Sequence, residues 1–133
     1  MKEIDDPSLR VYVIWLPMLP SDDSEDAVEA SREWVDSRVT YYWEPERATG
    51  KKWAQTLGLG RMGALFRSLG FSRVAWDVYL VFPRGQRWRD PAPEPLYWTH
   101  QLGGAFELTP SLDADTLVDR TRVILSAQNN YGK

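Results

Sequence analysis

The feature that most constrains the fold is a run of apolar, β-forming residues at 11–16, Val-Tyr-Val-Ile-Trp-Leu. A strand that is apolar on both faces must be covered on both sides, which is typical of the parallel sheets of α/β proteins. Pro17 and Pro20 follow the run and end it, because proline has no N–H to donate to a strand ladder. We therefore expect a buried strand at 11–16 in a sheet that carries helices.

The next segment predicts a helix over about 23–36. Asp22 and Glu25 stand three residues apart, which is the spacing of a capping box at a helix start. Apolar and small residues then recur at helical spacing, and this pattern predicts one buried helix face. The predicted face contains Ala27, Val28, Ser31, Trp34 and Val35.

The middle of the chain predicts a strand, a helix and a short helical stretch. Residues 38–43 alternate and are rich in β-formers, so they form the second predicted strand. Pro45 suits the first turn of a helix that runs to Leu57, and Gly58 suits the position just after its end. A further helical turn or two is expected within residues 62–69.

The last part of the chain predicts two strands and a closing helix. Residues 74–82 form the strongest predicted strand, and residues 86–88 could return antiparallel to it. Three prolines between Pro91 and Pro95 require a loop. A strand at 96–102 follows, and Thr109-Pro110 has the chemistry of a helix start. The buried face of that helix is predicted to contain Leu117, Thr121, Ile124 and Leu125.

This β-α-β-α-β-β-α order resembles the thioredoxin-like fold. The segments that carry the resemblance are Val11–Trp15, Trp76–Gly85 and the closing helix opened by Thr109-Pro110 with Leu112-Asp113. The resemblance implies an α/β fold with a mixed four-stranded sheet flanked by helices. It covers residues 9–127, so we expect residues 1–133 to form a single thioredoxin-like domain.

The chain departs from that family at the residues that carry its redox chemistry. The position of the Cys-x-x-Cys motif is occupied by Pro17 to Asp22, and the position of the cis-proline is occupied by Asp77. The sequence contains no cysteine at all, which excludes disulfides, thiolate metal sites and a cysteine nucleophile. The resemblance therefore implies a fold without thiol-disulfide oxidoreductase activity.

Charge and hydropathy narrow the class of partner. The formal net charge is −3, and Lys and Arg are not clustered among aromatic residues, so we expect no nucleic-acid binding. No apolar stretch approaches the ~20 residues of a membrane helix. A soluble, cytoplasmic protein is expected, and a leader removed ahead of residue 1 is left open.

Ligands of open α/β sheets bind beyond the carboxyl ends of the strands. That edge is predicted to hold Trp43 and Glu44, with Trp76 and Asp77 beside it. On the last strand, alternation places Trp98 and His100 on one face. We treat these six residues as candidate binding residues. No catalytic residue, cofactor or metal site is assigned, because the single histidine lacks an evident nucleophile and orienting partner.

Three readings of function follow from these residues. The first is a non-redox accessory module that binds a protein or peptide at the former redox edge. The alternative is a small-ligand-binding protein or non-thiol enzyme that uses Asp77, Glu44 and His100 at an aromatic-lined edge. The third is a homo-oligomer whose interface holds part of the seven tryptophans.

Overall fold

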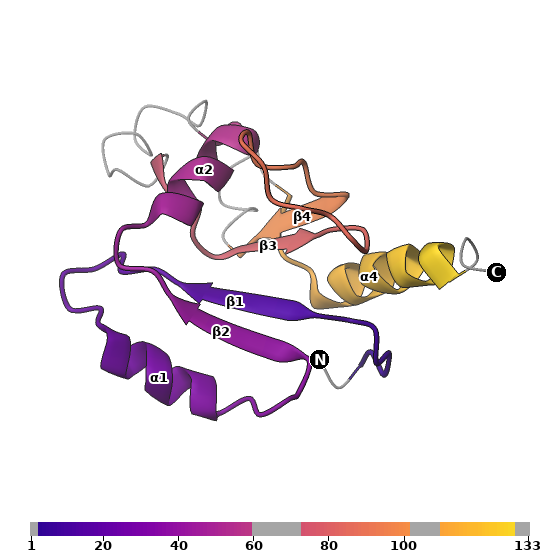
Figure 1. The fold of residues 1–133 in the computed structure, drawn as a ribbon, viewed down its shortest axis with the longest axis horizontal. Helices are drawn as coiled ribbons and strands as arrows, with labels where there is room; N and C mark the ends of the chain where they lie inside the picture. Colours follow the sequence, from indigo (N-terminus) through magenta and orange to yellow (C-terminus); the bar gives the residue numbers. More distant parts are fainter. Residues whose placement is uncertain (1–2, 60–72, 102–109, 130–133) are drawn as a thin grey trace.

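The computed structural model describes residues 3–59, 73–101 and 110–129 and shows a mixed α/β fold (Figure 1). The amino-terminal part contains strand β1 (Val11–Trp15), helix α1 (Ser24–Arg32) and strand β2 (Val39–Trp43). Helix α2 (Ala48–Thr56), strands β3 (Val78–Val81) and β4 (Tyr97–His100) and helix α4 (Ala114–Asn129) follow. The predicted helical stretch at 62–69 lies outside the described residues. In the described part, no helix combines the length and apolar character needed to cross a membrane.

The described strands pair in two separate sheets rather than in one sheet of four. β1 and β2 are parallel, with Val11 opposite Val39 and Trp15 opposite Trp43. β3 and β4 are antiparallel, with Val78 opposite His100. No ladder joins β1 to β3 in the described part. The α/β class therefore follows the prediction, whereas the mixed four-stranded sheet does not appear in the pairing.

The strand predicted at 74–82 is shorter than expected because its backbone is interrupted at Asp77. This residue has φ of 49°, a left-handed conformation that cannot belong to an extended strand. β3 consequently begins at Val78. The return strand predicted at 86–88 is wrong, since these residues carry no strand structure. Instead, Trp88 places its ring edge-on against Trp53, with centroids 5.0 Å apart.

Helix α1 starts and ends differently from the prediction. The residue that caps it is Asp23, whose carboxylate accepts the N–H groups of Glu25 and Asp26 at 2.8 and 3.0 Å. The predicted N-cap, Asp22, bonds to the preceding loop instead. The helix stops at Arg32, four residues before the predicted end.

The buried face of α1 is also narrower than predicted. Ala27 is buried, and the Ser31 hydroxyl accepts the indole N–H of Trp15 at 3.0 Å, which fixes the helix on the β1–β2 sheet. Val28, Trp34 and Val35 are exposed. Periodicity alone could not distinguish these positions, because the helix ends before Trp34 and Val35 could turn toward the sheet.

Helix α2 joins the two sheets at Gly50. Its carbonyl accepts the N–H of Ala75 at 2.8 Å. A Cβ at this position would lie 2.6 Å from Val74 Cγ1 and 2.7 Å from Leu16 Cδ1, so only glycine lets the helix approach so closely. Gly58 follows the helix with φ of 68°, as the prediction of a glycine after the helix end required.

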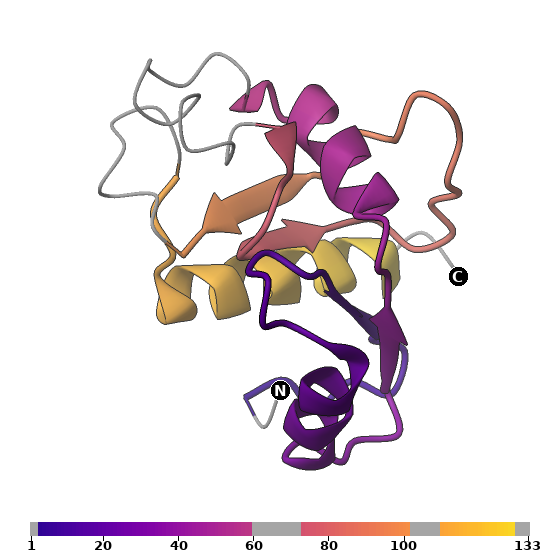
Figure 2. The ribbon, with the colours of Figure 1, turned by 90° about the vertical axis from the view of Figure 1, so that its left-hand side faces the viewer.

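The β3–β4 sheet lies between α2 and α4 (Figure 2). On the α2 side, Trp53 and Ala54 are buried in a cluster with Leu59, Ala75 and Ala92, against which the strand residues Val78, Leu80 and Trp98 pack. On the α4 side, the Arg120 guanidinium lies 6.0 Å from the centre of the Tyr97 ring. The predicted inner face of α4, with Leu117, Thr121, Ile124 and Leu125, is half-buried.

Helix α4 begins at Ala114, not at the predicted Thr109-Pro110. The side chain of Asp113 accepts the N–H of Thr116 at 2.7 Å and so serves the first turn. Pro110 instead pairs with the end of β4, because its carbonyl accepts the backbone N–H of His100 at 2.9 Å. The segment before α4 is therefore paired to β4 and cannot be helical. Thr109 itself lies outside the described residues.

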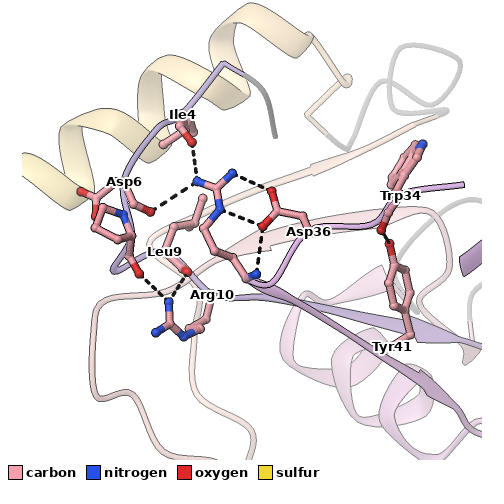
Figure 3. A network of polar contacts seen from close by, with 9 residues as sticks. Ile4, Asp6, Leu9, Arg10, Trp34, Asp36 and Tyr41 are labelled. Atoms are coloured by element: carbon pink, nitrogen blue, oxygen red, sulfur yellow. Dashed lines mark hydrogen bonds and ion pairs between the residues drawn. The ribbon is translucent and has the colours of Figure 1, made fainter. Parts of the chain in front are cut away.

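A polar network ties the first residues of the chain to the start of β2 (Figure 3). Arg38 forms a two-point contact with Asp36, at 3.0 and 2.7 Å. The same guanidinium donates to the carbonyls of Ile4 and Asp6, at 2.5 and 3.4 Å. From α4, Arg122 donates to the carbonyl of Glu3 at 2.7 Å. Two arginines from distant parts of the chain thus hold the segment that precedes β1.

Candidate functional site

The carboxyl ends of β1 and β2 lie side by side, as the parallel pairing requires. Trp15 and Trp43 end the two strands opposite each other, and both are half-buried. The N–H of Glu44 donates to the carbonyl of Trp15 at 3.0 Å, which extends the pairing by one residue. Trp43 and Glu44 therefore stand where the sequence predicted them, at the edge of the sheet that carries ligand sites in α/β folds.

Both carboxylate oxygens of Glu44 accept hydrogen bonds from the first residues of helix α2. One oxygen accepts the N–H groups of Ala48 and Thr49 at 2.7 and 3.1 Å, and the other accepts the Thr49 hydroxyl. The residue directly before the helix, Arg47, makes no side-chain capping bond. Glu44 consequently supplies the negative charge that stabilises the positive end of the helix. This role is structural, and it involves both carboxylate oxygens.

The rim loop, Pro17–Asp22, lies between strand β1 and helix α1. One carboxylate oxygen of Asp22 accepts the N–H groups of Met18 and Leu19, each at 2.7 Å. The loop thus satisfies its own donors, and it leaves the side chain of Leu19 60% exposed. Sequence reasoning missed this role of Asp22, because its capping-box spacing was the stronger local signal.

Trp76, Asp77 and His100 come together at the start of β3 and the end of β4. The rings of Trp76 and His100 meet edge to face, with centroids 5.6 Å apart. Asp77 is joined to the same strand end by its carbonyl, which accepts the N–H of Gln101 at 2.9 Å. His100 is only 1% exposed. Its carbonyl accepts the N–H of Leu112 at 2.9 Å, so it links β4 to the segment before α4.

Burial changes the pKa values of His100 and Asp77, and the electrostatic interaction between the two groups opposes each change. Burial lowers the pKa of His100, and the nearby Asp77 carboxylate partly offsets that change. The protein around the Asp77 carboxyl removes part of its hydration, which raises its pKa, while His100 acts against the shift. Asp77 as a whole residue remains exposed. Burial therefore favours the uncharged form of each group, and the charge of each group favours the charged form of the other.

The six predicted site residues belong to different parts of the structure. Trp76, Asp77 and His100 are neighbours, whereas Trp43 and Glu44 belong to the edge of the other sheet. Trp98 packs against the core cluster around Trp53. No group of three metal-ligating side chains occurs in the described residues, so Glu44 does not complete a ligand set with Asp77 and His100 there.

Comparison with known proteins adds no relative to this description. Neither a protein-family model, nor a curated protein, nor a solved structure matches the chain. The interpretation of its function consequently depends on its own residues.

Proposed function

We propose that this chain is a non-redox, thioredoxin-like module that binds a protein or peptide at the rim loop. The observation that carries the proposal is the way the loop satisfies its polar groups. Asp22 accepts the N–H groups of Met18 and Leu19, and Glu44 accepts those at the start of α2. These donors are the ones that an anionic ligand would use. With them occupied, the large apolar side chain that the loop offers to a partner is that of Leu19, which is exposed together with Pro20 and Ser21.

The thioredoxin-like arrangement is supported by the two strand pairs and by the Gly50 contact. A sheet with the order β2-β1-β3-β4 needs β1 parallel to β2 and β3 antiparallel to β4, which are the observed pairs. It also needs β1 next to β3. Gly50 packs against Leu16, directly after β1, and against Val74, shortly before β3. We propose that β1 and β3 are neighbours in the sheet.

Nuclear Overhauser contacts in solution test this arrangement. Backbone protons of Tyr12 and Ile14 are expected to show contacts with those of β3, and their N–H groups, which point away from β2, are expected to exchange slowly. Fast exchange along that edge of β1, with no contacts to β3, would contradict the four-stranded sheet and leave the rim loop to be tested separately.

Selection of peptides from a random phage library, followed by affinity measurement, tests the binding function. Leu19→Lys is expected to weaken the selected peptides by about tenfold or more, because it removes the apolar contact and adds a charge. Val123→Lys is the matched control, since Val123 is 64% exposed on α4, away from the rim loop. A library that yields no binder, or peptides that bind both variants equally well, would rule out the rim loop as the binding surface.

The second candidate function is a small-ligand site or non-thiol enzyme at Asp77 and His100. The observation in its favour is the carboxylate–imidazole pair itself. Against it stand the 1% exposure of His100 and the engagement of Glu44 by α2. A ligand bound there would lose affinity on Asp77→Asn, whereas a peptide at the rim loop would keep it. The two functions are therefore separable with one variant.

A further inference from the structure

The outer side of helix α1 is a shallow surface hollow with no other element packed on it in the described part of the chain. The inner side of the helix is held by Ala27 and by the contact between Ser31 and Trp15. The outer side is therefore presented to solvent in a fixed orientation. The hollow is lined by Ser24, Glu25, Val28, Glu29, Arg32 and Glu33.

Three glutamates form a row along this side. Glu25, Glu29 and Glu33 follow at intervals of four residues, which aligns them along a helix. The ion pairs found among the described residues involve none of these three carboxylates. Like charges at this spacing destabilise a helix by about 0.2–0.5 kcal/mol per pair. Arg32 also lines the hollow and offsets one of the three charges. The two remaining negative charges leave a surface to which a cationic partner would be attracted.

Large apolar side chains accompany the acidic row. Val28 lies within it and is 51% exposed, and Trp34 and Val35, directly after the helix, are 67% and 93% exposed. The backbone of Trp34 is held in place, because its carbonyl accepts the Tyr41 hydroxyl at 2.8 Å (Figure 3). The indole is consequently exposed on an anchored backbone. Tryptophan is also the residue type most enriched among the energetic centres of interfaces.

We propose that the α1 face, meaning the hollow with its three glutamates and Val28 and the exposed Trp34 and Val35 that follow the helix in sequence, docks a basic amphipathic segment of a partner protein. The acidic row attracts lysine and arginine side chains of the partner. The exposed Val28, Trp34 and Val35 provide an apolar surface for the partner's apolar side chains. An acidic or purely apolar partner would leave the glutamate row uncompensated. The proposal is independent of the rim loop, since no residue of that loop contributes to it.

The experiment measures binding of a fluorescent leucine–lysine peptide, with helical spacing of its leucines, by anisotropy at low and high salt. The wild-type protein is expected to bind it, and the triple change Glu25→Gln, Glu29→Gln and Glu33→Gln is expected to weaken binding by about tenfold or more. The variant Trp34→Ala is expected to weaken binding at both salt concentrations, because the lost contact is apolar. Circular dichroism verifies that each variant keeps the fold.

A matched control separates the α1 face from the negative charge of the whole protein. The triple change Glu46→Gln, Glu94→Gln and Asp115→Asn removes the same charge from exposed positions elsewhere, and it is expected to leave the affinity within about twofold. Equal weakening by both triple variants, an unchanged affinity in Trp34→Ala, or no binding to the wild-type protein would each overturn the proposal. None of these outcomes depends on Leu19, so failure here leaves the rim-loop proposal standing.

Discussion

Gly50 is the position at which a single methyl group is expected to matter most. In an ordinary helix interior, Gly→Ala stabilises a protein by up to ~1 kcal/mol. Here the new Cβ would lie 2.6 Å from Val74 Cγ1 and 2.9 Å from the Ala75 carbonyl oxygen, and the carbonyl is backbone that cannot rotate away. We expect Gly50→Ala to lower the free energy of unfolding by about 1–3 kcal/mol. Urea unfolding measures it. Gln55→Ala, at an exposed position of the same helix, serves as the control and should be neutral or slightly stabilising.

His100 makes the stability of the protein depend on pH in a predictable direction. Its pKa is lowered by burial from a usual value of 6.5, so the unfolded chain takes up a proton more readily than the folded one. The contribution of the neutral imidazole is complete above about pH 6.5 and is lost as the pH falls through the folded pKa. Asp77, with its raised pKa, acts oppositely, since its contribution is lost as the pH rises above about 3.8 toward its folded pKa.

Because the chain has one histidine, every histidine ring signal in an NMR spectrum reports this pair. Asp77→Asn is expected to lower the pKa of His100 further, since the carboxylate is the group that raises it. Asparagine also tolerates the left-handed backbone of position 77. An NMR titration of the wild-type protein and the variant measures the shift. A histidine pKa that stays the same or rises in the variant would show that the two groups do not interact.

The residues of the candidate site illustrate what sequence could and could not predict. Asp77 and His100 were selected as chemically capable side chains near a strand end, and they are neighbours in the structure. Glu44 was selected on the same grounds, yet its carboxylate caps α2. A sequence shows which side chains can accept hydrogen bonds, but which donor each one meets depends on the folded backbone, as Asp22 and Asp23 also show.

At the scale of elements, apolar patterning located the strands and helices but not their ends. The run at 11–16 gave β1 almost to the residue, because every side chain in it favours a strand. The spacing of Trp34 and Val35 fits a helix and so predicts a longer α1, but both side chains are exposed in the structure. The start of α4 was misplaced because Pro110 pairs with β4. Element ends depend on contacts between segments, which local patterns do not encode.

The capping of α2 by Glu44 gives a prediction at this scale. Glu44→Ala removes the acceptor of the Ala48 and Thr49 N–H groups, and we expect it to lower the free energy of unfolding by about 1–2 kcal/mol. Thermal or urea unfolding provides the measurement. Glu46→Ala is the matched control, because Glu46 lies two residues away and is exposed, and its carbonyl, not its side chain, bonds to Lys51. Equal losses in both variants would show that general charge, not capping, is responsible.

At the scale of the molecule, the lack of cysteine gives a firm expectation about activity. Reduction of insulin disulfides by dithiothreitol should proceed at the same rate with and without this protein, since thiol exchange requires a thiolate. The turbidity of precipitating insulin chains measures the rate. An acceleration that persists after further purification would mean that the protein promotes exchange by a route that needs no thiol of its own.

The first described residues of the chain are hydrogen-bonded both to the start of β2 and to α4. Arg38 and Arg122 donate to successive carbonyls, those of Ile4 and Glu3, and Ile4 is buried. A charged donor to a buried carbonyl is stronger than a neutral one, so Arg38→Ala should expose the segment before β1. We expect faster amide exchange there and a lower melting temperature. Arg89→Ala, at an exposed position, should change neither.

The response to low pH is expected to distinguish the Arg38–Asp36 contact from an ordinary surface ion pair. Arg38 lowers the pKa of Asp36 to about 2, so the carboxylate stays charged well below the pH at which most aspartates are neutralised. Its contribution is present above about pH 3.8 and is lost only as the pH falls toward 2. The protection of amides before β1, measured as the exchange rate relative to an unfolded chain at the same pH, should therefore remain high at pH 4 in the wild-type protein and be low there in Asp36→Asn. If the wild-type protein already loses this protection between pH 6 and pH 4, the segment is held by something other than this pair.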